Sequence, residues 1–216
     1  TNQLYINKTS VIRAVVLLNN QKTSEVSTQS YIFPNDIIRQ NNSPEGYPAE
    51  WGPYTAIPGN AIADYEMDPE MMGVGNFANT VKEALLDIPT ISLVTDKDHI
   101  FSHSLDPDEG GIYIYPGAPG DETGLGWERP VSFEYFDNES LSVQANCGIR
   151  LQGGHSRRPE KNPKHSFLLV FKSEYGPSKL DYSLFEGEAQ PEYDKLILRA
   201  GFGNSWTHHS HDERQR

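Results

Sequence analysis

The sequence predicts a β-rich α+β fold made mainly of antiparallel strands and ordered loops, with few helices. Runs rich in β-branched and aromatic residues recur along the 216 residues, and they are separated by Gly, Pro, Asp and Asn. The 18 Gly and 15 Pro supply frequent turn signals. Only the stretch 77–88 has the apolar spacing of a helix. A chain of this length can bury a core of one or two domains.

The first segment, residues 1–33, is expected to consist of strands. Ser10–Leu18 is rich in β-branched residues, and Asn19-Asn20 follows it as a turn signal. A second strand, Ser27–Phe33, ends at Pro34. Because two or three strands do not make a stable sheet alone, they must pack on the rest of the chain or pair with strands outside it.

The second segment, residues 34–89, combines recurrent prolines with several aromatic residues. A disordered linker would be poor in aromatic residues, so this composition favours an ordered strap over a linker. The strap is expected to end in one helix over 77–88, which Asn76 can cap and Pro89 must stop. Its apolar residues at helical spacing are Phe77, Val81, Ala84, Leu85 and Ile88.

The third segment, residues 90–216, is expected to form a mainly antiparallel sheet. Its predicted strands cover 90–94, 111–115, 131–136, 143–151, 165–172 and 195–200. The single cysteine, Cys147, excludes an internal disulfide. It lies in the alternating stretch Leu141–Leu151, which favours a buried structural thiol over a nucleophile.

The net charge narrows the class of partner. With 30 Asp and Glu against 18 Lys and Arg, the chain carries a charge of −12. This argues against a general nucleic-acid binder and against docking on an anionic membrane. No run of about 18 apolar residues is present, so no membrane span is predicted. The first residues have no charged and apolar leader pattern, which fits a cytosolic chain or a mature or cut piece of a longer one.

Against this acidic background, Gly148–Arg158 and Pro163–Phe167 form a basic, glycine-containing stretch. If the strands on either side form a hairpin, Gly153-Gly154 lets the backbone approach a ligand, and nearby cations and hydroxyl groups can donate to phosphate oxygens. The candidate phosphate-binding residues are Arg150, Gly153, Gly154, Ser156, Arg157 and Lys164. From spacing alone, a hairpin loop with solvated cations explains the stretch equally well, because it matches neither the P-loop nor the kinase glycine signature.

The order of several short motifs resembles the spore-coat protein H (CotH) kinase-like family. The downstream motifs are Gly148-Ile-Arg-Leu-Gln-Gly-Gly-His-Ser-Arg, Pro163-Lys-His-Ser-Phe, Glu174-Tyr-Gly, Lys179-Leu-Asp-Tyr-Ser-Leu-Phe and Lys195-Leu-Ile-Leu-Arg-Ala-Gly. The upstream motifs are Asp64-Tyr-Glu-Met-Asp-Pro-Glu, Ile88-Pro-Thr-Ile-Ser-Leu-Val, Gly111-Ile-Tyr and Trp127-Glu-Arg-Pro-Val-Ser, which are similar to large secreted bacterial members. The resemblance covers nearly the whole chain.

The resemblance implies an atypical protein kinase that uses ATP and Mg²⁺ to phosphorylate Ser or Thr of secreted or cell-surface proteins. Residues 1–33 would be the closing strands of a preceding chitobiase-C-terminal-like β-sandwich, and 90–216 the first kinase lobe. Lys164 would be the strand lysine, although the family often has Lys-Lys where this chain has Lys164-His165. The catalytic and metal-binding aspartates are expected beyond Arg216, so the fragment alone is not expected to catalyse.

The alternative is a non-catalytic extracellular module that binds glycans or proteins. Its support is the acidic, aromatic-rich composition and the sandwich-like first segment; the aromatic residues considered for sugar stacking are Trp51, Tyr54, Trp127 and Trp206. Four groups of acidic or histidine residues could bind metal ions, but a solvated terminus or loop is the favoured interpretation of each. These groups are His208, His209, His211 with Asp212; Asp96 with Asp98; Asp106, Asp108 with Glu109; and Asp64, Glu66, Asp68 with Glu70.

Overall fold

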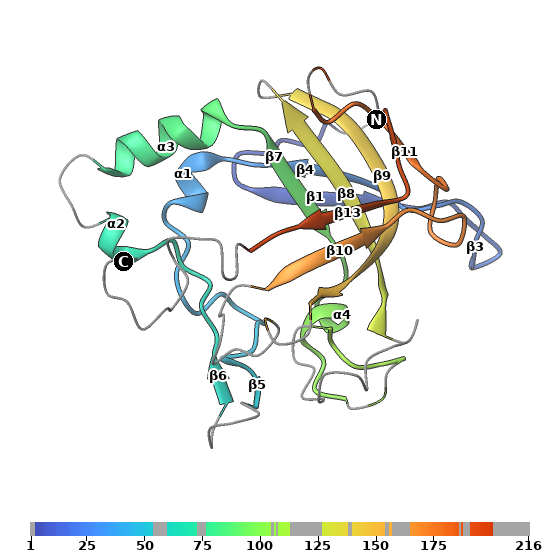
Figure 1. Ribbon diagram of the computed structural model, residues 1–216, viewed down its shortest axis with the longest axis horizontal. Coiled ribbons are helices and arrows are strands. Elements are labelled where there is room, and N and C mark those ends of the chain that lie inside the picture. Colours follow the sequence, from blue (N-terminus) through green and yellow to red (C-terminus); the bar gives the residue numbers. More distant parts are fainter. Residues whose placement is uncertain are drawn as a thin grey trace. The chain divides into compact units, whose positions relative to one another are not determined.

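The computed structural model describes residues 3–53, 60–72, 77–104, 106, 108–112, 127–137, 140–153, 156, 165–185, 187 and 191–200. In these residues the protein is β-rich and mainly antiparallel, with short helices, so the predicted fold class is confirmed (Figure 1). The chain divides into two compact units, each built from segments that alternate along the sequence. Unit 1 contains Thr1–Gly46, Asp64–Val94 and Ser132–Asn146; unit 2 contains Tyr47–Ala63, Thr95–Val131 and Cys147–Arg216. The three consecutive segments expected from the sequence stay a prediction.

The largest sheet has five strands in the order β13-β10-β9-β8-β7. The strands are β7 (Thr90–Val94), β8 (Arg129–Asp137), β9 (Ser140–Gln152), β10 (Ser166–Val170) and β13 (Lys195–Leu198). The pairs β7–β8, β9–β10 and β10–β13 are antiparallel. Five of the six strands predicted after residue 89 are therefore present, with ends that differ by a few residues.

Strand β8 lies between β7 and β9, and its middle is buried on both faces. Val131 and Phe133 point to one side of the pleat, whereas Ser132 and Glu134 point to the other. All four side chains are buried. The sequence therefore alternates between apolar and polar residues even though both faces are covered, which requires polar partners for Ser132 and Glu134.

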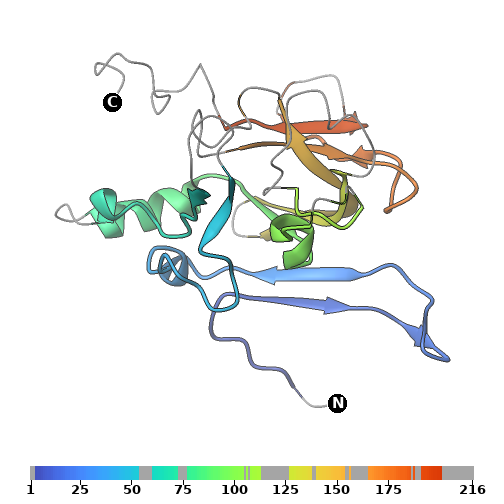
Figure 2. The same cartoon turned by 90° about the horizontal axis from the view of Figure 1, so that it is seen from below.

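In unit 1, β1 (Ser10–Ala14) and β4 (Ser27–Tyr31) form a two-stranded antiparallel ribbon. The ribbon continues into the short pair β2 (Leu17–Leu18) and β3 (Gln21–Lys22), as Figure 2 shows in blue. Asn19 and Asn20, with φ of 50° and 63°, make the turn between β2 and β3. Two left-handed residues in a two-residue loop are the mark of a type I′ hairpin, which confirms the predicted turn.

A buried carboxylate attaches this ribbon to β7 and β8. Glu134 accepts hydrogen bonds from the Ser30 N–H at 2.9 Å and from the Ser30 hydroxyl at 2.5 Å. Because the Ser30 hydroxyl has one proton, the 2.8 Å contact between Ser30 Oγ and Ser92 Oγ is donated by Ser92. Asn146 Nδ2 also donates to the Val26 carbonyl at 3.0 Å. The N-terminal strands thus pack on later parts of the chain, one of the two arrangements expected.

Helix α3 (Phe77–Asp87) matches the predicted helix to within one residue and ends before Pro89. The strap residues before it contain elements that the sequence did not reveal: α1 (Pro34–Ile37), β5 (Glu50–Pro53), β6 (Asn60–Ile62) and α2 (Pro69–Met72). Pro34 and Pro69, two of the recurrent prolines of the strap, begin helices, where the missing N–H costs nothing. The predicted cap, Asn76, lies outside the described residues.

The strand expected over 111–115 is wrong for its two described residues. Gly111 and Ile112 follow α4 (Lys97–Phe101) in a turn, and their N–H groups donate to the carbonyls of Ser102 and His99. Ile112 is 1% exposed, so its apolar side chain belongs to the core. The pair β11 (Leu180–Asp181) and β12 (Glu192–Tyr193) was not expected. Within the part of the chain that the structure describes, no helix is both long and apolar enough to cross a bilayer.

Candidate functional site

Strands β9 and β10 form the hairpin expected around the basic glycine stretch. Gln152 pairs with Ser166, and Arg150 pairs with Leu168. Gly153 leaves β9 with a φ of 104°, a conformation that L side chains rarely adopt. A Cβ at this position would also collide with the Ser156 hydroxyl oxygen. The positive φ therefore favours glycine at residue 153, and a larger residue would also displace the Ser156 hydroxyl.

The structure describes half of the predicted phosphate-binding residues. Arg150, Gly153 and Ser156 are described, and they lie at the end of β9 and in the turn that follows. The remaining predicted residues, Gly154, Arg157 and Lys164, lie outside the described residues. His165, considered for the strand-lysine position, is buried directly before β10. Which of Lys164 and His165 takes that position stays a prediction.

An ionic cluster surrounds the buried Glu128 in unit 2. We call Glu128, Arg150, Lys172 and Tyr175 the Glu128 cluster. The Glu128 side chain is 1% exposed and lies 2.7 Å from Lys172 Nζ through Oε1. Its other oxygen lies 3.7 Å from Arg150 Nε. Arg150 and Lys172 remain partly exposed, at 31% and 25%. One carboxylate thus holds two cations at the protein surface.

Local structure brings these groups together. Glu128 directly precedes β8. The Arg129 guanidinium fixes the backbone of this segment by donating to the carbonyls of Glu128 at 3.1 Å and Gly110 at 2.5 Å. Lys172 follows β10 and begins a turn in which the Tyr175 N–H donates to the Lys172 carbonyl at 3.0 Å. Burial lowers the pKa of the Arg129 guanidinium, whose role here is structural.

The turn also surrounds Lys172 with favourable partners. Its ammonium lies 2.9 Å from the exposed Glu174 and 4.9 Å from the centre of the Tyr175 ring, within the range of a cation–π contact. The hydrogen bond with Glu128 is the main cause of a raised Lys172 pKa. Burial, followed by the negative charge of Glu128, raises the pKa of Tyr175 to about 12. Lys172 is therefore a permanent cation and Tyr175 a neutral phenol at neutral pH.

Gly148 makes room for the cluster on strand β9. A Cβ there would lie 2.6 Å from Tyr175 Cε2 and 2.7 Å from Glu128 Oε1, far inside ordinary contact. Glycine in a strand interior often marks the close approach of another group, and at this position the group is the buried carboxylate. The cluster therefore depends on a residue without a side chain.

The neighbouring thiol is inert. Cys147 is fully buried, which confirms the expected structural cysteine. Burial, followed by the negative charge of Glu128, raises its pKa to about 12. Because the thiolate is the reactive form, Cys147 does not act as a nucleophile near neutral pH.

The exposed side of the Glu128 cluster carries two cationic side chains. Glu128 and the exposed Glu174 together balance the two positive charges of Lys172 and Arg150, and Glu174 is the 62% exposed partner. A buried carboxylate that fixes a lysine and an arginine pre-organises donors for phosphate or carboxylate oxygens. The partly exposed Lys172 and Arg150 thus present cationic donors within a chain whose net charge is −12.

Three members of the cluster were not predicted as site residues: Glu128, Lys172 and Tyr175. They lie outside the glycine-rich stretch and meet only because β8, β9 and β10 are neighbours in the sheet. The one local signal was Gly148, which interrupts the alternating strand on its polar face.

The other candidate sites have weaker support. Among the described residues, no group of three His, Cys, Asp or Glu side chains is placed to hold a metal ion. Trp51 stacks on Phe101 at 6.4 Å, and Trp127 lies against Gly110, so both rings pack within unit 2. Tyr54, Trp206 and the histidines at 208–211 lie outside the described residues.

Comparisons with protein-family models, curated proteins and solved structures gave no match for this chain. The resemblance to the CotH family therefore rests on the sequence motifs alone.

Proposed function

We propose that the Glu128 cluster and the turn after β9 form the phosphate-binding wall of a CotH-like atypical protein kinase. The observation that carries the proposal is the 2.7 Å ion pair between the buried Glu128 and the strand-end Lys172, with Arg150 beside it. Kinases place a lysine held by a glutamate near a glycine-containing turn that covers the nucleotide phosphates. The hairpin carries Gly153 at its turn, and Lys172 follows the opposite end of β10, beyond the Gly148–Val170 pair.

Each residue has a distinct proposed task. Lys172 and Arg150 neutralise phosphate oxygens, and Glu128 holds both cations in position. Gly153 and Ser156 would offer backbone and hydroxyl donors at the turn of the hairpin, and Gly154, Arg157 and Lys164 stay candidate donors from the same stretch of sequence. ATP with Mg²⁺ supplies the phosphoryl group for Ser or Thr of secreted or surface proteins. The proposal assigns no catalytic or metal-binding aspartate among these 216 residues, so the part proposed for this chain is weak nucleotide binding without phosphate transfer.

The second candidate function is a glycan- or protein-binding surface module. Its specific support is Tyr47, which is 49% exposed and lies edge-on to Phe101 at 6.0 Å. Half-exposed aromatic rings held by other rings provide flat, apolar surfaces on which sugars can stack. The rings of Trp51 and Phe101 form the support of this surface.

A thermal-shift measurement separates the two functions. ATP with Mg²⁺ in excess is expected to raise the midpoint of unfolding, because a ligand that binds only the folded state stabilises it. Inorganic tripolyphosphate should produce part of the same shift, since the proposed contacts are to phosphates. Stabilisation by chito-oligosaccharides alone would favour the surface module, and no response to nucleotide would contradict the kinase proposal.

A further inference from the structure

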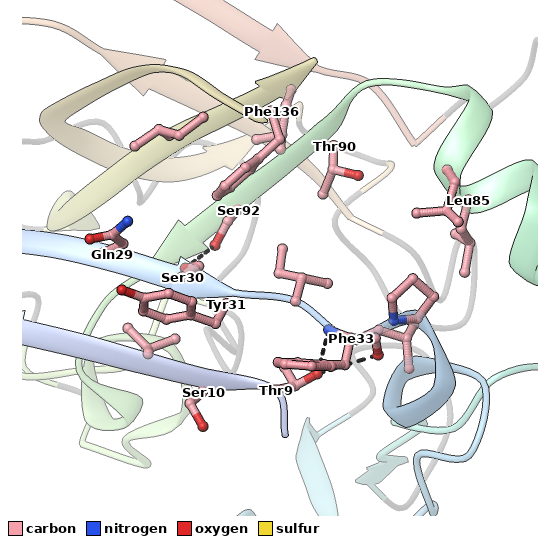
Figure 3. Close-up of a pocket in the computed structure, with 17 residues that line it drawn as sticks. Thr9, Ser10, Gln29, Ser30, Tyr31, Phe33, Leu85, Thr90, Ser92 and Phe136 are labelled. Atoms are coloured by element: carbon pink, nitrogen blue, oxygen red, sulfur yellow. Dashed lines mark hydrogen bonds between the residues drawn. The ribbon is translucent and has the colours of Figure 1, made fainter. Parts of the chain in front are cut away.

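Unit 1 contains a pocket of about 700 Å³. None of the residues that line it belongs to the Glu128 cluster. Its walls come from the ribbon strands β1 and β4, the helices α1 and α3, and strands β7, β8 and β9 (Figure 3). Apolar side chains supply most of the wall, among them Ile37, Leu85 and Phe136. This volume lies in the range of pockets that bind small molecules, roughly 300–1,000 Å³.

The pocket has no formal charge on its walls. Of the 17 described residues that line it, none is Asp, Glu, His, Lys or Arg. This composition is unusual in a chain with 30 acidic and 18 basic residues. A charged ligand would lose its hydration on entering the pocket and would find no opposite charge among these residues, so its binding would cost free energy. The walls therefore select an uncharged ligand.

Several of the apolar walls are open to solvent. The lining side chains that are more than a third exposed are Val11 (47%), Leu141 (40%), Leu86 (39%), Ile91 (38%) and Ile32 (37%). Clustered exposed apolar side chains commonly mark a binding site. Covering them with an apolar ligand would be favourable in proportion to the area removed from water.

A few hydroxyl groups interrupt the apolar wall. Ser30 and Ser92 hydrogen-bond to each other, and Ser30 also donates to Glu134, so these two belong to the ribbon anchor. Tyr31 and Thr90 contribute further hydroxyl groups to the lining, and both are labelled in Figure 3. Hydroxyl groups of this kind can orient a ligand that carries one polar group.

We propose that this pocket binds a small uncharged molecule with an apolar body and one hydroxyl or carbonyl group. The uncharged lining, the exposed aliphatic walls and the volume determine this chemistry. The inference does not depend on the proposed kinase function, because every lining residue belongs to unit 1 and every member of the Glu128 cluster to unit 2.

Fluorescence titration with Nile red, an uncharged apolar dye with a carbonyl group, tests this site. We expect saturable binding of one dye per chain. 1-Decanol should displace the dye, and decanoate of the same chain length should compete at least about tenfold less well near neutral pH. Equal competition by the alcohol and the carboxylate would overturn the proposal, as would the absence of saturable binding.

Two variants connect the dye to this pocket. Leu141→Lys adds a charge at a rim position that is 40% exposed, and this variant should bind the dye at least about tenfold more weakly. Ile197→Lys is the control: it adds the same charge at a 52% exposed position of unit 2 and should leave dye binding unchanged. Ile91→Trp fills the pocket without a charge and should also abolish binding. Circular dichroism checks that each variant is folded. Unchanged dye binding in both pocket variants would overturn the proposal. Sedimentation velocity gives a second check: a dimer of the unaltered chain that dissociates in the Leu141→Lys variant would also overturn it, because a second copy would then cover these residues.

Discussion

Replacing Glu128 by alanine is expected to lower the free energy of unfolding by about 2–3 kcal/mol, because Lys172 and Arg150 lose the buried carboxylate that holds them. The effect stays at the low end for a buried pair, since both cations are partly exposed and Lys172 keeps Glu174. Urea unfolding monitored by circular dichroism measures the change. ATP-dependent stabilisation should be lost in the same variant.

The matched control is Glu192→Ala. Glu192 pairs with Lys179 at the same kind of distance, 3.0 Å, but its side chain is 46% exposed. An exposed ion pair contributes little, so this variant should lose less than about 1 kcal/mol and keep its response to nucleotide. Equal losses in the two variants would show that the burial of Glu128 has no energetic consequence.

Replacing Gly148 by alanine is expected to disrupt the cluster without removing any of its charged groups. The added Cβ would lie 2.6 Å from the Tyr175 ring and 2.7 Å from Glu128 Oε1, so both must move. Overpacking of this kind typically costs about 1–3 kcal/mol. Because the carboxylate moves away from Lys172, phosphate binding should weaken together with stability.

Gly187→Ala provides the comparison for Gly148→Ala. Gly187 has a φ of 75°, so alanine is strained there, but nothing lies within 4 Å of the added Cβ. This variant should lose stability through backbone strain alone and retain phosphate binding. A Gly148→Ala protein with normal stability and normal binding would contradict the placement of Glu128 over this strand.

The sequence predicts the regular elements well where a local pattern determines them. The apolar spacing of α3 and the stop at Pro89 define the helix, and Asn19-Asn20 defines the turn of the β2–β3 hairpin. The β9–β10 hairpin follows from two strands joined by glycines. Helices α1 and α2 were not predicted because proline is common both in loops and at the first position of a helix, and both helices begin at a proline, Pro34 or Pro69.

The sequence predicted only the part of the candidate site that lies within one local stretch. Arg150 and Gly153 lie within one basic stretch, so their proximity is a matter of local spacing. Glu128 and Lys172 are far apart in the chain and meet through the order of strands in the sheet. Similarly, the alternating pattern of its strand predicts that Glu134 is exposed. In the structure it is buried, because Ser30, with Ser92 beside it, lies against its carboxylate. Sheet order is the information that a single sequence lacks.

The measurement that tests the phosphate-binding role most directly is the affinity for ATP with Mg²⁺ at fixed ionic strength. The double variant Glu128→Gln with Lys172→Met is suitable because it removes both charges of the ion pair, which costs far less stability than removing one. Lys179→Met, at a 49% exposed position, is the control. We predict that the double variant binds at least about tenfold more weakly than the unaltered chain, while Lys179→Met binds equally well. Equal affinity in the double variant and the unaltered chain would contradict the assignment of the Glu128 cluster to phosphate binding.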